Sequence, residues 1–588
     1  YFQFKSLKKL ENFYEKTLKY ALYKNKAYLF FFGTIGVLIL SLVFVGIVQP
    51  KVLFFPENQP NQIMAYIEYP EGTDIHKTNK LTKKVEQRIF ETINKYEDED
   101  GYNFMVESAI SQVGKGSGNP MTDAGQVNEM PHRGKVTLSM REFKLRRDVK
   151  SSQVLNEVRN AVKGFPGVSI IVEKDQAGPP SGYPINIELK GEDYNLMLAE
   201  AERMREFIER TSIEGIEELK IDINKSKPEL LVNVNRDKAG QLGISTGQIG
   251  QVIRRSIFGE EASTYKDDEE DYQINVRFNE ELRYDENAIF NQPVTFRNNK
   301  GKIIQTPIST LIETQPSATF SSIKRKDLKR VITLYSNVLG NYNGNEIVSQ
   351  IQNELKYFSL DKSINYKFTG EQEKQDENLD FLIKALLVAI GGILLILVAQ
   401  FNSISKPLII LMAVVLSLGG VFFGLGIFQM DFIIIMTMMG IISLAGIVVN
   451  NAIVLVDYTQ ILIDRRKEKL NLEDDQMLTR DQYFEEIVAG GKSRLRPVLL
   501  TAITTVLGLI PLAVGLNIDF FGLFVDYAPN IYIGGDNVIF WGPLAWTVIF
   551  GLIFATFLTL IVVPVMFYLM IRAKLRFKTE PENIAASE

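Results

Sequence analysis

Two adjacent amides, Asn450 and Asn451, interrupt a long apolar run that extends from residue 432 to about residue 463. A carboxamide donates and accepts hydrogen bonds but cannot hold a charge, so the pair can orient or relay protons without storing one. Polar groups inside apolar helices are costly and commonly functional, although hydrogen bonds that only hold helices together are a serious alternative. The two asparagines are the first candidates for chemistry within a membrane.

Titratable residues are scarce in the apolar runs. Lys384 lies one helical turn from Asp380 at the edge of one run. This is typical of a pair at the membrane boundary whose charged ends snorkel to water. Asp457 lies toward one end of its run and also has the place of a boundary group. Arg494 precedes another run, and Thr501 lies within it. The sequence therefore shows no obvious buried acid.

Several kinds of chemistry are disfavoured. The chain has no cysteine, which excludes a thiol nucleophile, a disulfide framework and thiolate metal sites. His76 and His132 are too few and too separate to suggest a metal site, and the glycine-rich stretch 114–118 lacks the phosphate-loop pattern. A net charge of −5 gives no nucleic-acid footprint. Without a nucleophile and base, we expect no catalytic residue and no enzyme.

Five methionines in the polar part of the chain are the one alternative for metal chemistry. Clustered thioethers suit soft Cu(I) or Ag(I), but methionine more often fills hydrophobic cores. The residues are Met64, Met105, Met121, Met130 and Met140. We expect no metal site; metal-dependent binding that disappears on replacing Met121, Met130 and Met140 would support metal export.

Six apolar runs are long enough to cross a hydrocarbon core of about 30 Å, which needs about 20 residues. They occupy residues 27–49, 381–401, 407–428, 432 to about 463, 497–516 and 541–571. The predicted membrane regions are thus 27–49, 380–463 and 493–572. An even number of spans places both termini on one side.

Lysine and arginine mark that side. They gather before the first run, between the fourth and fifth runs and after the last, whereas the loop 517–540 has none. The positive-inside rule therefore predicts that segments 1–26 and 573–588 are cytoplasmic and that the block 50–379 is not. Segment 464–492 is charged and amphipathic, which favours a place along the cytoplasmic membrane surface.

The polar block has the pattern of two β-α-β-β-α-β units. A proline- and glycine-rich linker at 178–184 separates them, and after a strand at 230–235 the second unit is interrupted by a separate insertion. The predicted parts are 50–177 for the first unit, 178–235 and 321–379 for the second, and 236–320 for the insertion. Two such units side by side leave a cleft, a common place for ligands.

Local sequences along nearly the whole chain resemble the RND (resistance-nodulation-division) exporters. GIVVNNAIVLVDY at 446–458 resembles the fourth span of their C-terminal half, and RLRPVLLT at 494–501 with GLIPL at 508–512 resembles the start of the next. GEQE at 370–373 and AQFNS at 399–403 flank the second span in the same way. VNRDKA at 234–239 with LGIS at 242–245 is similar to the entry of their docking subdomain. Within the superfamily, the hydrophobe and amphiphile exporters are the most similar.

The resemblance implies a multi-domain α+β integral membrane protein. Its six-helix transmembrane bundle would carry a periplasmic porter domain of two ferredoxin-like α/β subdomains with an inserted docking subdomain. The implied partners are an N-terminal RND half (a separate chain or a missing part), two further copies in a homotrimer, a periplasmic adaptor, an outer-membrane channel and the lipids of the bacterial inner membrane. Nucleic acid is not among them.

The implied function is efflux of amphiphilic or hydrophobic compounds across the Gram-negative envelope, driven by the proton motive force. Protons would be the coupling ion, no cofactor is expected, and substrate would bind in the cleft between the two porter subdomains. Drug-exporting members carry a lysine at the position of Asn450, where it pairs with aspartates of the N-terminal half. This chain departs from that pattern, which keeps two alternatives open: a non-transporting scaffold or assembly subunit, and heavy-metal efflux.

Four residues are the candidates for proton relay or coupling. Arg494 and Thr501 match positions on the cytoplasmic side of the family's proton path, and a membrane anchor of the positive-inside kind is the alternative for Arg494. Asn450 and Asn451 complete the set.

Overall fold

A computed structural model describes residues 7–56, 58–120, 129–175, 182–223, 227–268, 270–298, 300–319, 323–340, 342–472 and 476–585. The chain divides into two compact units. The first comprises Tyr1–Tyr69, Ile75–Asp222 and Lys324–Glu588, and the second comprises Pro70–Asp74 and Ile223–Ile323. Each unit is described separately.

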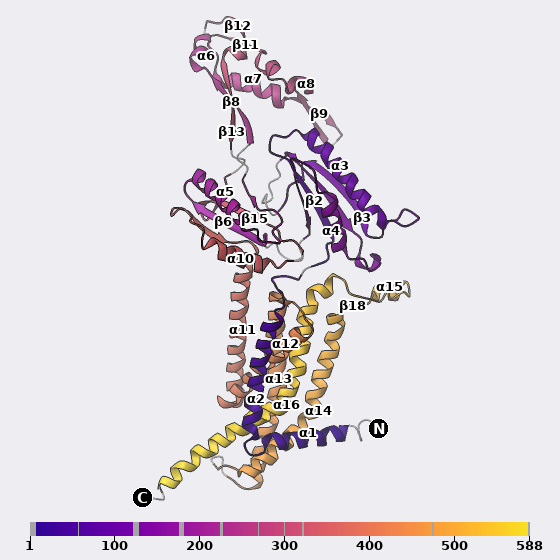
Figure 1. Ribbon diagram of the computed structural model, residues 1–588, viewed down its shortest axis with the longest axis vertical. Helices are drawn as coiled ribbons and strands as arrows, with labels where there is room; N and C mark the ends of the chain where they lie inside the picture. Colours follow the sequence, from indigo (N-terminus) through magenta and orange to yellow (C-terminus); the bar gives the residue numbers. More distant parts are fainter. Residues whose placement is uncertain are drawn as a thin grey trace. The chain divides into compact units, whose positions relative to one another are not determined.

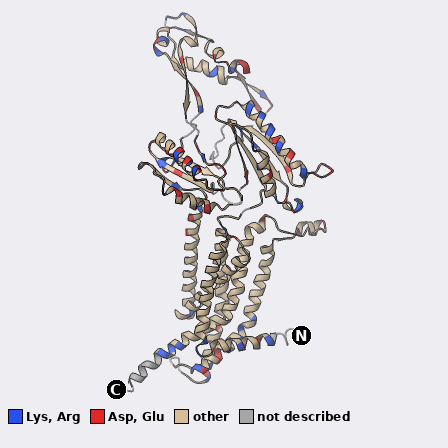
Figure 2. Ribbon diagram, viewed as in Figure 1, with Lys and Arg blue, Asp and Glu red and all other residues tan. Residues whose placement is uncertain are grey.

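In the described part of the chain, six helices are long and apolar enough to cross a membrane. They are α2 (Lys26–Val48), α11 (Glu371–Phe401), α12 (Ser405–Ile427), α13 (Ile434–Lys469), α14 (Arg480–Val514) and α16 (Asp536–Ala585). Each contains one of the six expected runs, and Figure 2 shows charged residues at the helix ends and few along their middles. Because α14 begins at Arg480 and continues through Pro497, the segment expected along the membrane surface is partly built into α13 and α14.

The six helices form an inner and an outer set. In α16, 83% of the most apolar window is buried by other helices, against 6% in α2. Helices α12, α13 and α16 lie side by side at the centre, as Figure 1 shows. A Cβ atom on Gly420 of α12 would lie 2.8 Å from the Phe550 carbonyl oxygen of α16 and would overlap the Phe554 side chain. Gly420 and Gly424, one helical turn apart on α12, therefore permit the close approach of α16.

A short amphipathic helix, α1 (Leu7–Leu22), packs on this bundle through the buried side chains of Tyr14, Leu18 and Leu22. The Tyr14 hydroxyl donates a 2.7 Å hydrogen bond to the Leu560 carbonyl of α16. That carbonyl has no helical donor, because the residue four positions later is Pro564, which lacks an N–H. The contact explains how a proline is accommodated inside a buried helix.

The first α/β subdomain is a four-stranded antiparallel sheet with two helices. Its elements are β2 (Gln62–Glu68), α3 (Ile75–Ile93), β3 (Val106–Gly114), β4 (Met130–Met140), α4 (Ser151–Ala161) and β5 (Ser169–Lys174). The strand order is β3-β4-β2-β5. Side chains of β4 alternate between buried and half-buried, as expected for a strand with one covered face. The order is that of a split β-α-β unit.

The second α/β subdomain repeats this order as β7-β15-β6-β16, with β14 also beside β15. Its elements are β6 (Ile185–Gly191), α5 (Tyr194–Arg210), β7 (Lys220–Ile221), β14 (Arg325–Lys326), β15 (Lys329–Ser336), α10 (Gly344–Leu355) and β16 (Asn365–Phe368). Asp193 begins α5 because its carboxylate accepts hydrogen bonds from the free N–H groups of Asn195 and Leu196.

The second compact unit is inserted between β7 and β14. Its elements are β8 (Lys227–Val234), α6 (Arg236–Leu242), α7 (Thr246–Phe258), β9 (Glu260–Asp267), β10 (Glu270–Val276), α8 (Glu280–Arg283), α9 (Glu286–Phe290), β11 (Pro293–Arg297), β12 (Ile303–Pro307) and β13 (Ile312–Thr319). The strand expected at 230–235 is β8, and it pairs with β13 of the same unit rather than with the second sheet. Local alternation predicted the strand, but its partner lies far along the chain.

Candidate functional site

Two of the four relay candidates meet between α13 and α14. The Asn451 side chain is buried, and its Oδ1 lies 3.1 Å from the hydroxyl oxygen of Thr501. The same hydroxyl lies 2.9 Å from the Val498 carbonyl oxygen, so its single proton is shared between two acceptors. An amide held this way can pass on the orientation of a hydroxyl but stores no charge.

Asn450 lies elsewhere on the helix. Its side chain is exposed on the bundle surface, and its amide makes no hydrogen bond to any residue that the structure describes. Ser443, Gly446 and Asp457 are exposed on the same helix. Spacings of three, four and seven residues place all four on one face of an α-helix. We call Ser443, Gly446, Asn450 and Asp457 the α13 stripe.

The α13 stripe is the functional feature that sequence reasoning missed. The helical spacing of one small and three polar residues was visible in the sequence. A Cβ atom on Gly446 would meet nothing within 4 Å, so this glycine packs against no described part of the chain. A polar amide exposed to hydrocarbon is costly. The stripe is therefore a polar surface on an otherwise apolar helix, and it contacts little in the described part of the chain.

Arg494 contacts a residue that is not among the other three candidates. Its guanidinium carbon lies 4.0 Å from the centre of the Tyr458 ring, a distance suited to a cation–π contact. Its Nε is buried and has no hydrogen-bond partner among the described residues. Because Tyr458 belongs to α13 and Arg494 to α14, the contact ties these two helices together near the Asn451–Thr501 pair.

The junction of the two α/β subdomains, where the cleft was expected, holds a buried acid. Glu173 of β5 is 9% exposed. Its carboxyl oxygens accept hydrogen bonds from Asn337 Nδ2 at 2.8 Å, the Tyr183 hydroxyl at 3.0 Å and Asn119 Nδ2 at 3.1 Å. Burial raises the pKa of Glu173, although the three donors act in the opposite direction. Tyr183 and Asn337 belong to the second subdomain, so one carboxyl joins both.

Charged pairs continue along this junction. Lys220 of β7 lies 3.5 Å from a carboxyl oxygen of Glu68 and 2.7 Å from the Ser169 hydroxyl. Burial would raise the pKa of Glu68, but the charges of Arg133 and Lys220 outweigh it and hold that pKa below its usual value. Arg159 of the first subdomain pairs with Glu217 of the second at 3.4 Å. The two subdomains are therefore joined by polar contacts whose strength depends on protonation.

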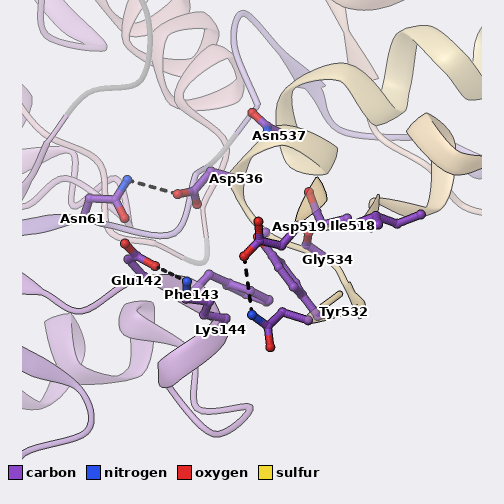
Figure 3. A pocket seen from close by; sticks show the side chains of 13 residues that line it. Asn61, Glu142, Phe143, Lys144, Ile518, Asp519, Tyr532, Gly534, Asp536 and Asn537 are labelled. Carbon is purple, nitrogen blue, oxygen red and sulfur yellow. Dashed lines mark hydrogen bonds and ion pairs between the residues drawn. The ribbon is translucent and has the colours of Figure 1, made fainter. Parts of the chain in front are cut away.

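A second polar site lies where the first subdomain meets the loop between α14 and α16, shown in Figure 3. That loop contains β18 (Leu516–Asn517), α15 (Phe520–Val525) and β19 (Tyr532–Ile533), and it borders a pocket of about 470 Å³. Asn61 donates to the carboxylate of Asp536, the first residue of α16, at 3.1 Å. The buried guanidinium of Arg146 donates to Asn61 Oδ1 at 2.7 Å. The sheet is thus fixed to the start of the most buried membrane helix.

A second connection joins the same parts. The short strand β1 (Val52–Leu53), which follows the first span, pairs in parallel with β17 (Phe432–Ile433), which precedes α13. The helix that carries the stripe therefore begins against the segment leading into the first sheet.

Two of the five methionines are core residues. Met105 and Met140 are buried in the hydrophobic core of the first subdomain, and Met121 lies outside the described residues. Among His, Asp and Glu of the described residues, no cluster of three could hold a metal ion.

Comparisons with known proteins agree on one family. The profile of the AcrB/AcrD/AcrF family matches residues 2–518. Multidrug resistance protein MdtC of Proteus mirabilis is 22% identical over 98% of this chain and 50% of its own length. Cobalt-zinc-cadmium resistance protein CzcA of Cupriavidus metallidurans is 25% identical over 66% of this chain and 33% of its own length.

A solved structure has the same fold. A heavy metal efflux pump matches with a TM-score of 0.68 and 21% identity, over 96% of this chain and 53% of that one. Nearly all of this chain matches MdtC and the efflux pump, but it spans only about half of their length. These matches confirm the resemblance stated from the sequence: the chain belongs to the AcrB/AcrD/AcrF family, within the RND superfamily.

Proposed function

We propose that this chain is the C-terminal half of an RND transporter that exports amphiphilic or hydrophobic compounds, driven by the proton motive force. The observation that carries the proposal is the α13 stripe. In lipid, the Asn450 amide would lose its water without gaining a hydrogen bond. A second membrane half that covers the stripe would remove that cost, and it could supply carboxylates in the middle of the membrane, where the sequence of this chain shows no obvious buried acid.

The Asn450 amide of the stripe would take part in coupling by hydrogen bonding. A carboxylate of the covering half that faces Asn450 would accept a hydrogen bond from the amide when ionised and donate one when protonated. Asn450 would therefore sense the protonation state without changing its own charge. Asn451 is the next residue on α13. Its contact with Thr501 would transmit the change to α14.

The α/β subdomains would handle substrate. We propose the cleft between them as the binding place and the polar junction around Glu173 as the contact that changes when the cleft opens. The expected setting is a homotrimer in the bacterial inner membrane with both termini in the cytoplasm. A periplasmic adaptor and an outer-membrane channel would complete the path across the envelope.

Heavy-metal efflux is the second candidate. The likeness to CzcA and to a heavy metal efflux pump favours it. The burial of Met105 and Met140 in a hydrophobic core opposes it, because a thioether must reach the cleft to bind a passing ion. A non-transporting scaffold is the third candidate, and it predicts no effect of Asn450 on transport.

Transport by the full-length protein in proteoliposomes tests the proposal. With a pH gradient imposed, Asn450→Leu should lower export of a fluorescent amphiphile at least tenfold, while Asn450→Gln, which keeps the amide, should retain most of it. Both variants should insert and purify like the parent, because the Asn450 side chain is exposed and its amide makes no hydrogen bond to any described residue. Equal export by all three proteins would remove Asn450 from the mechanism.

A further inference from the structure

An apolar groove runs between α2, α12 and α16 near the end of the bundle where α1 lies. Its volume is about 360 Å³, within the range of small-molecule sites. Tyr28 and Phe32 of α2, Leu408 and Met412 of α12 and Leu569 of α16 line it. The walls therefore suit a hydrocarbon chain and nothing more polar.

Cations stand at one end of this groove. Arg572 lies three residues after Leu569 on α16, and its guanidinium carbon is 5.4 Å from the centre of the Tyr28 ring. It also donates to the Lys24 carbonyl at 3.2 Å, which brings the turn before α2 to the same place. Lys24, an exposed cation, lies in that turn, whereas the Lys26 ammonium lies over the Tyr20 ring of α1, 3.4 Å from its centre.

None of these cations is neutralised within the described part of the chain. Lys24, Lys26 and Arg572 form no ion pair with a carboxylate there. Their neighbours are aromatic rings, the Lys24 carbonyl and the Asn25 side-chain oxygen, which orient a cation without cancelling its charge. Elsewhere on the same end of the bundle, Lys492 pairs with Glu15 at 2.6 Å. The groove thus has an unpaired positive rim.

We propose that the groove is a binding site for an anionic phospholipid. One acyl chain would lie against Phe32, Leu408 and Met412, and the phosphate would accept hydrogen bonds from Arg572 and Lys24. Charge complementarity selects this occupant, because a zwitterionic lipid brings its own cation to the rim and a neutral hydrocarbon leaves the rim unpaired. Tyr28 joins the two parts, since its ring borders the groove and faces Arg572. Such a lipid would fix α2 against α12 and α16, the helix pair that holds the bundle together.

Lipid competition on the full-length protein tests the proposal. The detergent-purified protein would be exchanged into bilayers of equal parts phosphatidylglycerol and phosphatidylcholine, and retained lipid would be identified by native mass spectrometry. The double variant Arg572→Gln with Lys24→Gln should retain phosphatidylglycerol at least tenfold less, because each basic side chain near an anionic surface contributes about a fivefold preference. Lys469→Gln, an exposed cation at the end of α13, is the matched control and should leave retention unchanged.

A second variant separates the groove from the rim. Met412→Trp fills the apolar part and leaves every cation in place, so it should also lower phosphatidylglycerol retention, although the net charge is unaltered. Inorganic phosphate at millimolar concentration should not displace the lipid, because it has no chain for the groove. Equal retention of the two lipids by the parent, displacement by free phosphate, or equal losses in the double variant and in Lys469→Gln would each overturn the proposal.

Discussion

Glycines on two faces of the membrane bundle are packed differently. Where α12 meets α16, Gly420 lies against Phe550 and Phe554. On the outer face of α13, Gly446 meets no atom that a Cβ would touch, and Asn450 has no hydrogen-bond partner among the described residues. One face is packed within the chain, and we propose that a neighbouring polypeptide packs on the other.

The difference separates stability from function in this bundle. Residues on the closed face determine whether the six helices hold together, since their contacts all lie within the chain. Gly446 and Asn450 of the α13 stripe make few contacts with the described residues, so we expect them to contribute little to that stability. Substitutions on the two faces should therefore fail in different ways.

The largest expected effect is Gly420→Val on the closed face. The new side chain would overlap Phe554 and the Phe550 backbone, and overpacking of this kind costs about 3 kcal/mol. Detergent-purified protein should lose its monodisperse form at a clearly lower temperature than the parent. Gly391→Val on α11 is the matched control, because a Cβ there meets nothing within 4 Å.

Gly446→Val makes the same chemical change on the open face. The isolated helices have room for the valine, so thermal stability in detergent should match the parent. Export should nevertheless fall, because a partner helix that approaches the stripe closely has no space for the added methyl groups. A variant that exports normally would show that no helix packs at Gly446.

Tyr14→Phe probes how the closed face accommodates its proline. Removing the hydroxyl leaves the buried Leu560 carbonyl without a donor, which costs about 1–3 kcal/mol. The melting temperature should fall by less than in Gly420→Val. Tyr20→Phe, on an exposed tyrosine of the same helix, should leave the melting temperature unchanged.

The subdomain junction gives the smallest effect and a pH dependence. Burial raises the pKa of Glu173 in the folded protein, so the folded state favours the protonated acid. The stabilising contribution is complete below the ordinary glutamate pKa and is lost as pH rises through the raised one. Amide exchange of β5, corrected for intrinsic rates, should show less protection at higher pH.

Glu173→Gln should remove this slope, because its side chain does not titrate. Glu107→Gln, which replaces an exposed acid on β3, should keep the slope of the parent. A slope that survives in Glu173→Gln would place the titrating group elsewhere in the junction.

Much of the fold could be predicted because its signals are local. The length of the six apolar runs is enough to find six helices, and the glycine spacing on α12 predicts its close packing. Strand β8 shows the limit, since its alternation is local but its partner β13 lies about 80 residues away. No pattern in the sequence reveals that pairing.

Some parts of the candidate site could also be predicted from the sequence, and others could not. Asn451 and Thr501 were both named from the sequence, and α13 and α14 bring them together. The Glu173 junction could not be found, because Asn119, Tyr183 and Asn337 converge on it from three distant segments. The α13 stripe could have been found, because its helical spacing lies within fifteen residues.

Photo-crosslinking from single cysteines tests directly whether another polypeptide covers the α13 stripe. This chain has no native cysteine, so Asn450→Cys and Val415→Cys each offer one attachment site for a benzophenone probe in native membranes. Val415 is 44% exposed on α12, away from the stripe. We predict protein adducts at position 450 and lipid adducts at position 415. Lipid adducts at both positions would contradict it, because the stripe would then face the bilayer uncovered.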